Sequence, residues 1–93
     1  MGRILIADLQ AVVARINRMT GSPLTYSDSK PGEKFKANVG HYHLDQAYGG
    51  TKLVRTMNEG GGITEITHGF NSKRETYELM HAFIRGLEEG DSK

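Results

Sequence analysis

Two histidines one residue apart form the spacing in this chain that most suggests chemistry. His41 and His43 are followed by Asp45. Alternate side chains of a β-strand point to the same side, so these three could offer imidazole and carboxylate ligands to one metal ion. A further ligand would have to come from His68 or Glu65. A solvated sheet face explains the same spacing, and we predict neither a metal nor a cofactor.

Signatures of enzymatic catalysis are missing from the sequence. None of its serines lies in a Gly-x-Ser-x-Gly motif, and no Ser-His-Asp or paired-carboxylate spacing can be recognised. Gly60 to Gly62 lacks the Lys-Ser/Thr of a phosphate-binding loop. The chain has no cysteine, which excludes thiolate nucleophiles and disulfides and is compatible with a reducing compartment. We therefore predict that this protein is not an enzyme.

Basic and aromatic residues provide the candidate binding surface. With 12 basic and 11 acidic side chains the net charge is +1, so attraction to nucleic acid would need a local patch. Such a patch could form on adjacent predicted strands, where basic side chains accompany an exposed aromatic ring. Ordinary solubilising charge is the alternative explanation. The candidate binding residues are Tyr48, Lys36, Lys52 and Arg55.

Both ends of the chain carry helical patterns. Apolar residues recur at helical spacing over 4–19, and Gly21 followed by Pro23 marks the end of that helix. Residues 72–75, Ser-Lys-Arg-Glu, match a capping box, which predicts a second helix that ends near Gly90.

The middle of the chain carries strand patterns. We predict a loop over 22–34 and strands over 35–39, 42–48, 51–57 and 63–68. Gly49-Gly50 predicts a two-residue hairpin turn, because both central positions of a type I′ turn need positive φ.

These elements predict an α+β fold, a two-layer sandwich in the order α-β-β-β(-β)-α. Two amphipathic helices would cover one face of an antiparallel sheet of three or four strands. A chain of 93 residues fits one domain, here residues 1–90 with a polar tail at 91–93, and we expect a complete small gene product. The other sheet face would lie in water unless a second copy covers it; its side chains would be those of His41, His43, Asp45, Lys52 and Thr56.

The predicted order of elements resembles the double-stranded-RNA-binding domain, whose last helix begins with basic residues. Ser72-Lys73-Arg74 matches that feature. Further lysines and alanines along the helix are missing, and four glutamates stand on or near it: Glu75, Glu78, Glu88 and Glu89. The resemblance implies nucleic-acid binding as an alternative function.

Residues 42–55 and the segment Ile63-Thr64-Glu65-Ile66 resemble small bacteriophage and prophage proteins that share an Ala-Tyr-Gly-Gly-x-x-Leu hairpin. The likeness covers about half the chain and carries over no functional residues. It implies an accessory protein that binds a host protein, a nucleic acid or a signalling nucleotide and does no chemistry itself. We expect it to act in the cytoplasm of a bacterial host, where the protein contact could also be a homodimer built on the uncovered sheet face or an edge strand. No stretch approaches the roughly 18 apolar residues of a membrane helix. We therefore predict a non-enzymatic protein-interaction module with no membrane contact.

Overall fold

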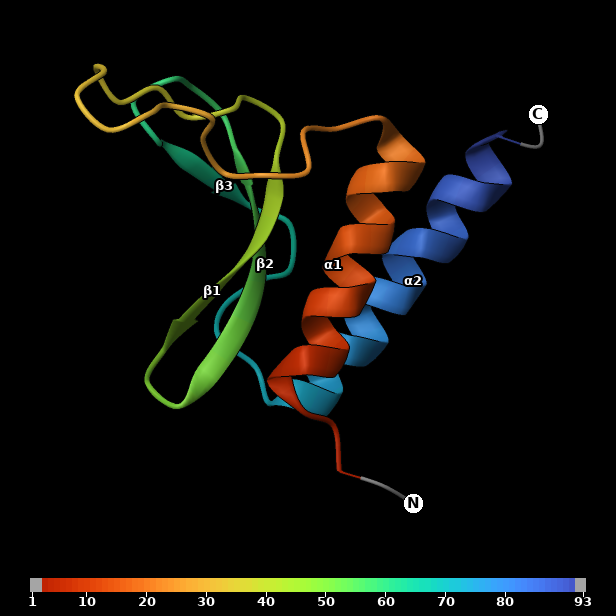
Figure 1. The fold of residues 1–93 in the computed structure, drawn as a ribbon. Helices are drawn as coiled ribbons and strands as arrows, with labels where there is room; N and C mark the ends of the chain where they lie inside the picture. The colour runs from red at the N-terminus through yellow and green to blue at the C-terminus, as the bar shows by residue number, and fades with distance from the viewer. Residues whose placement is uncertain (1–2, 92–93) are drawn as a thin grey trace.

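The computed structural model describes residues 3–91, which form an α+β fold with a helix at each end. Figure 1 shows the helices side by side on one face of the sheet, running in the same direction, as the two-layer prediction requires. None of the helices in this part of the chain is long and apolar enough to cross a membrane. The elements in chain order are α1 (Ile6–Thr20), β1 (Tyr42–Ala47), β2 (Gly50–Thr56), β3 (Ile63–Glu65) and α2 (Lys73–Asp91).

The helix ends follow the signals in the sequence. The Asp8 carboxylate accepts a hydrogen bond from the backbone N–H of Leu5 at 2.7 Å, and Gly21 closes α1 with φ of 67° in the left-handed region. The Ser72 hydroxyl accepts from the N–H of Glu75 at 3.1 Å and so caps α2. Helix α2 continues one residue into the predicted tail, at Asp91, and residues 92–93 lie outside the described part.

The strands form an antiparallel sheet in the order β1-β2-β3. Leu44 pairs with Leu53, and both face the helices, while Asp45 pairs with Lys52 on the opposite face. The alternation in the sequence therefore assigned β1 side chains to the correct faces. Strand β3 ends at Glu65, three residues before its predicted end at His68.

The predicted hairpin turn is wrong by one residue. Ala47 pairs with Gly50, so the turn consists of Tyr48 and Gly49, with φ of 53° and 73°. Gly50 belongs to β2 and must be small for another reason: a Cβ there would lie 3.0 Å from the Cβ of Phe70 and 3.2 Å from the backbone oxygen of Asn71. Gly50 thus allows the close approach of the loop at Phe70, and Tyr48 takes the first position of the turn.

The strand predicted over 35–39 does not form. Ala37 makes only an isolated bridge with Ser27, and Phe35 is half exposed. The backbone N–H of Asn38 donates to the carbonyl of Tyr26 at 2.8 Å, and that of Ala37 donates to the carbonyl of Glu59 at 2.8 Å, so the segment bonds to its own loop and to the turn after β2. It could not join β2, because β1 and β3 already occupy both edges of that strand.

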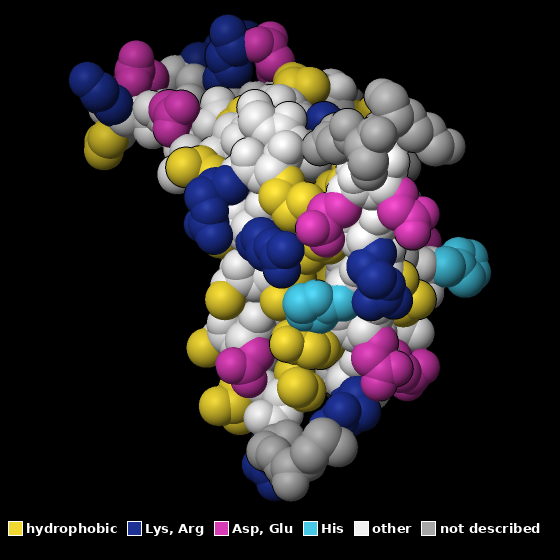
Figure 2. Space-filling view, turned by 90° about the vertical axis from the view of Figure 1, so that its right-hand side faces the viewer, with side chains coloured by type: hydrophobic (Ala, Val, Ile, Leu, Met, Phe, Trp, Pro, Cys, Tyr) yellow, Lys and Arg dark blue, Asp and Glu magenta, His cyan; other side chains and the backbone are white. Residues whose placement is uncertain are grey.

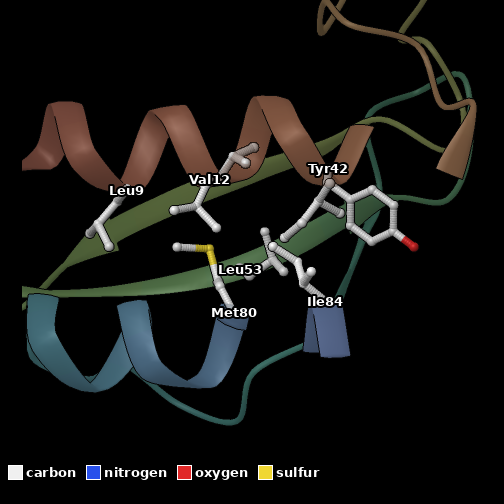
Figure 3. Close-up of a cluster of buried hydrophobic side chains, with 8 residues drawn as sticks. Leu9, Val12, Tyr42, Leu53, Met80 and Ile84 are labelled. Atoms are coloured by element: carbon white, nitrogen blue, oxygen red, sulfur yellow. The ribbon is translucent and has the colours of Figure 1, made fainter. Parts of the chain in front are cut away.

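One apolar cluster fills the space between helices and sheet. Figure 3 shows side chains from α1 and α2 converging on Leu53 of β2. Tyr42 closes one end of the cluster, where its ring lies 5.8 Å from that of Phe83. The buried members are Leu9, Val12, Val13, Ile16, Tyr42, Leu53, Met80 and Ile84.

A buried polar side chain ties each helix to the sheet. The amide of Asn17, 2% exposed, donates to the Tyr42 carbonyl at 3.0 Å and accepts from the Tyr42 N–H at 2.9 Å. On the other side, the hydroxyl of Thr76 in α2 donates to the Thr51 carbonyl at 3.1 Å. Buried polar groups are costly unless they are paired, so these contacts fix the position of each helix along its strand.

Replacing Asn17 tests this arrangement. Asn17→Ala leaves the N–H and carbonyl of Tyr42 buried without partners, and we expect the free energy of unfolding to fall by about 2 to 3 kcal/mol. Urea denaturation followed by circular dichroism measures the change. Gln10→Ala, at an exposed position of the same helix, should shift stability by less than about 0.5 kcal/mol. Equal effects of the two variants would contradict the proposed role of Asn17.

Candidate functional site

The four candidate binding residues do not form one surface. Lys36 lies in the loop before β1, where its ammonium contacts Glu59 at 3.0 Å. Arg55 faces the helical side of the sheet: its guanidinium lies 4.8 Å from the centre of the Tyr42 ring, and its Nε donates to the Gly40 carbonyl at 3.1 Å. The Arg55 contact is partly buried and the Lys36–Glu59 pair is exposed, and neither contact involves the residues at the hairpin turn.

Tyr48 and Lys52 do come together, through a residue that sequence analysis missed. Phe70 lies beneath both: the rings of Tyr48 and Phe70 meet edge to face at 5.7 Å, and the Lys52 ammonium lies 4.4 Å from the centre of the Phe70 ring. We call these three residues the hairpin site. Phe70 follows β3 in a loop without strand or helix pattern, and no local signal linked it to the hairpin.

Charge pairing holds Lys52 in this cluster. Its ammonium donates to Glu65 Oε1 at 2.7 Å, and only 12% of the Lys52 side chain is exposed. The hydrogen bond from Lys52 lowers the pKa of the Glu65 carboxyl, with further help from the Gly69 N–H. Lys52 therefore serves as part of the support under Tyr48 and is not a free cation for a ligand.

Tyr48 itself is almost free of the protein. It is 96% exposed and is the one non-glycine residue with positive φ among residues 3–91. A bulky side chain in the left-handed region is strained, and asparagine or glycine would occupy this turn position at lower cost. The fold gains little from the ring, which leaves nearly all of its surface in solvent.

The sheet face predicted to lie in water is covered by the protein itself. His41 is buried, and its Nδ1 lies 2.8 Å from the Pro23 carbonyl. The Tyr26 ring meets His43 edge-on at 5.3 Å, so the loop over 22–40 shields this end of the face, as Figure 1 shows at the far end from the hairpin turn. Sequence analysis erred because local patterns do not show where a long loop folds back.

The two histidine rings stack at 5.5 Å between their centres. No group of three His, Cys, Asp or Glu suited to a metal ion lies within residues 3–91. His43 Nδ1 is buried without a hydrogen-bond partner in the described structure. Burial, and secondarily the charge of His41, lowers the pKa of His43 below its ordinary 6.5.

A basic hollow lies beside the hairpin turn. Its volume is about 450 Å³, and its lining includes Gly49 of the turn, Ser72 at the start of α2, and three cations, Arg3, Lys73 and Arg74. Sequence analysis had noted Lys73 and Arg74 but could not place Arg3 near them. On the side of the helices, by contrast, Lys and Arg side chains stand among Asp and Glu side chains, as Figure 2 shows.

No protein-family model matches this chain, and no curated protein or solved structure is significantly similar to it. The features of the described residues that could contact another molecule are the hairpin site, the basic hollow and the edges of the sheet.

The lowered pKa of His43 predicts acid sensitivity. Because the unfolded chain binds the proton more readily than the folded protein, stability is full above the unfolded pKa of 6.5 and falls as pH drops through that value toward the lower folded pKa. Urea unfolding at about pH 7.5 and about pH 5 measures the loss. His43→Gln should flatten this dependence, whereas His68→Gln, at a fully exposed position, should retain it. If the stability of the wild-type protein did not change on acidification, the lowered pKa of His43 would be refuted.

Proposed function

We propose that this protein is a non-enzymatic protein-interaction module, an accessory protein of phage type that binds a host protein in the bacterial cytoplasm. The exposed, strained Tyr48 at the tip of the β1–β2 hairpin is the observation that carries the proposal. Its ring is the contact that a partner's pocket would take up.

The turn sequence supports a binding role. Positive φ at a tyrosine costs on the order of 1 kcal/mol or more, and a residue 96% exposed recovers little of that cost through packing. Backbone strain that no contact within the protein requires is typical of residues that bind another molecule. Tyrosine is also among the residues that most often dominate the binding energy of protein interfaces.

A small cluster of side chains lies beside Tyr48. Phe70 meets the Tyr48 ring edge to face, and the Lys52 ammonium, paired to Glu65, lies over the Phe70 ring. Because the Tyr48 ring is 96% exposed, almost all of its surface is available for a partner to bury. A hydrophobic ring supported by a satisfied ion pair suits a protein pocket rimmed by polar groups.

Tyr48→Asn separates binding from folding. Asparagine accepts the left-handed conformation, so we expect the free energy of unfolding to rise by about 1 kcal/mol or stay level. Quantitative affinity capture from bacterial lysate should lose the protein retained by the wild type. Leu79→Ala, which removes an exposed apolar side chain from α2, should retain it. A partner captured equally by Tyr48→Asn would reject Tyr48 as the contact.

Nucleic-acid binding is the second candidate, favoured by the basic hollow. Arg3, Lys73 and Arg74 border a depression next to the turn that carries Tyr48, so phosphate contacts and stacking on an aromatic ring could occur together. Lys36, Lys52 and Arg55, on which sequence analysis based this function, are each engaged by other groups of the protein. We therefore place the candidate nucleic-acid site at the start of α2 and not on the sheet surface.

Charge reversal tests this second candidate. A single-stranded RNA of about 16 nucleotides, whose bases are free to stack on Tyr48, should bind the wild-type protein with an affinity that falls steeply as salt rises, because phosphate contacts release counterions. The double variant Lys73→Glu and Arg74→Glu should lose that binding, while Lys36→Glu, outside the hollow, should keep it. Fluorescence anisotropy measures both. Equal affinity of the two variants, or no binding by the wild type at low salt, would eliminate this function.

A further inference from the structure

The outer edge of β1 carries unpaired backbone groups. The Thr56 N–H donates to the His41 carbonyl at 3.0 Å, which places the backbone groups of His43 and Asp45 toward β2 and those of Tyr42, Leu44 and Gln46 outward. Asn17 satisfies the outward groups of Tyr42. No residue in the described part of the chain bonds those of Leu44 and Gln46. A short stretch of β1 is therefore open to another strand.

The open edge leads into a groove. Helix α1 forms one wall with Val13 and Ala14, and the loop after it forms the other with Leu24 and Tyr26, enclosing about 350 Å³ beside His43. Leu24 and Tyr26 are among the exposed large apolar side chains. An extended segment that pairs with Leu44 would continue into this groove and bury an apolar side chain there.

Asp45 sets the charge of the segment that fits. It lies between Leu44 and Gln46 and faces away from the helices, opposite Lys52. The Lys52 ammonium turns to Glu65 instead, and Asp45 makes no ion pair within residues 3–91. In an added antiparallel strand, the residue opposite Asp45 would belong to a non-hydrogen-bonded pair, where side chains are closest. A lysine or arginine complements it.

A second copy of the chain fits this edge poorly. Twofold pairing of Leu44 with Gln46 of the copy sets two Asp45 carboxylates directly opposite each other, which is destabilising. A register in which Leu44 faces Leu44 of the copy would need the backbone N–H and carbonyl of Tyr42 for pairing. Asn17 already bonds both of these groups. A register in which Gln46 faces Gln46 of the copy would need Tyr48 as a paired strand residue. The left-handed turn conformation of Tyr48 ends the strand before that position. The geometry therefore favours a different protein.

We propose that a partner protein binds as an added antiparallel strand along the edge of β1. Its segment carries a lysine or arginine opposite Asp45 and, two residues later, an apolar side chain in the groove between α1 and Tyr26. This inference rests on the proposed protein-binding function and names the chemistry of the partner. It adds main-chain pairing along the edge to the contact made by Tyr48.

The test uses the full-length protein and the synthetic peptide acetyl-Thr-Val-Lys-Val-Leu-Thr-amide. At saturating peptide, amide exchange by NMR should slow by about tenfold at Leu44 and Gln46, the two open positions. The N–H of Glu65, at the outer edge of β3, should not change. Asp45→Asn should weaken the peptide roughly two- to fivefold. Asp45→Lys should reverse the preference toward the same peptide with glutamate in place of lysine.

Three outcomes would overturn the inference. Unchanged exchange at Leu44 and Gln46 in millimolar peptide would show that the edge takes no strand. Equal binding of lysine and glutamate peptides would remove Asp45 as the determinant. If amide exchange at Leu44 and Gln46 slowed with rising protein concentration in the absence of peptide, the edge would be assigned to a second copy of the chain. Capture with Tyr48→Asn tests the broader function separately, because that variant leaves Leu44, Asp45 and Gln46 in place.

Discussion

The paired hydrogen bonds between Asn17 and Tyr42 are the constraint on which the remaining structure depends. One buried amide satisfies the outward backbone groups of an edge strand, as a neighbouring strand would, and so holds α1 against β1. This contact holds the last turns of α1 at β1, and the loop that follows Gly21 reaches Tyr26 onto His43. It also sets the boundary of the open edge, which begins at Leu44. The packing of α1, the covering of the histidines and the accessibility of the β1 edge thus all depend on the contact between Asn17 and Tyr42.

The hairpin combines a strained tip with firmly anchored strands. Two residues with positive φ give the tight turn, and the tyrosine among them is strained and exposed. The cost is tolerable because the strands are anchored elsewhere: Leu53 lies in the core, and Thr51 is bonded to Thr76 of α2. A hairpin with such anchors can carry an unfavourable tip, whereas an isolated hairpin, marginal in water, could not.

The protein's own loops cover much of the sheet face away from the helices, and this limits how a partner can bind. Tyr26 and Pro23 contact the histidines at one end, and Phe70 contacts Lys52 at the other. A broad dimer on that face would have to displace these contacts. The accessible features are smaller and lie at the margin of the sheet: the tip at Tyr48, the open edge, and the basic hollow. Each suits a segment or a single side chain better than a flat surface.

Local patterns determined the helices with their caps at Gly21 and Ser72, the hairpin to within one residue, and the faces on which Leu44 and Asp45 lie. Those features depend on backbone periodicity and on residues adjacent in the chain. Only the tertiary structure decided that residues 35–39 remain a loop, that Phe70 supports Tyr48, and that Lys36 and Arg55 are engaged elsewhere. Such contacts join residues far apart in the sequence, and they follow from the packing of whole elements, which no local spacing encodes.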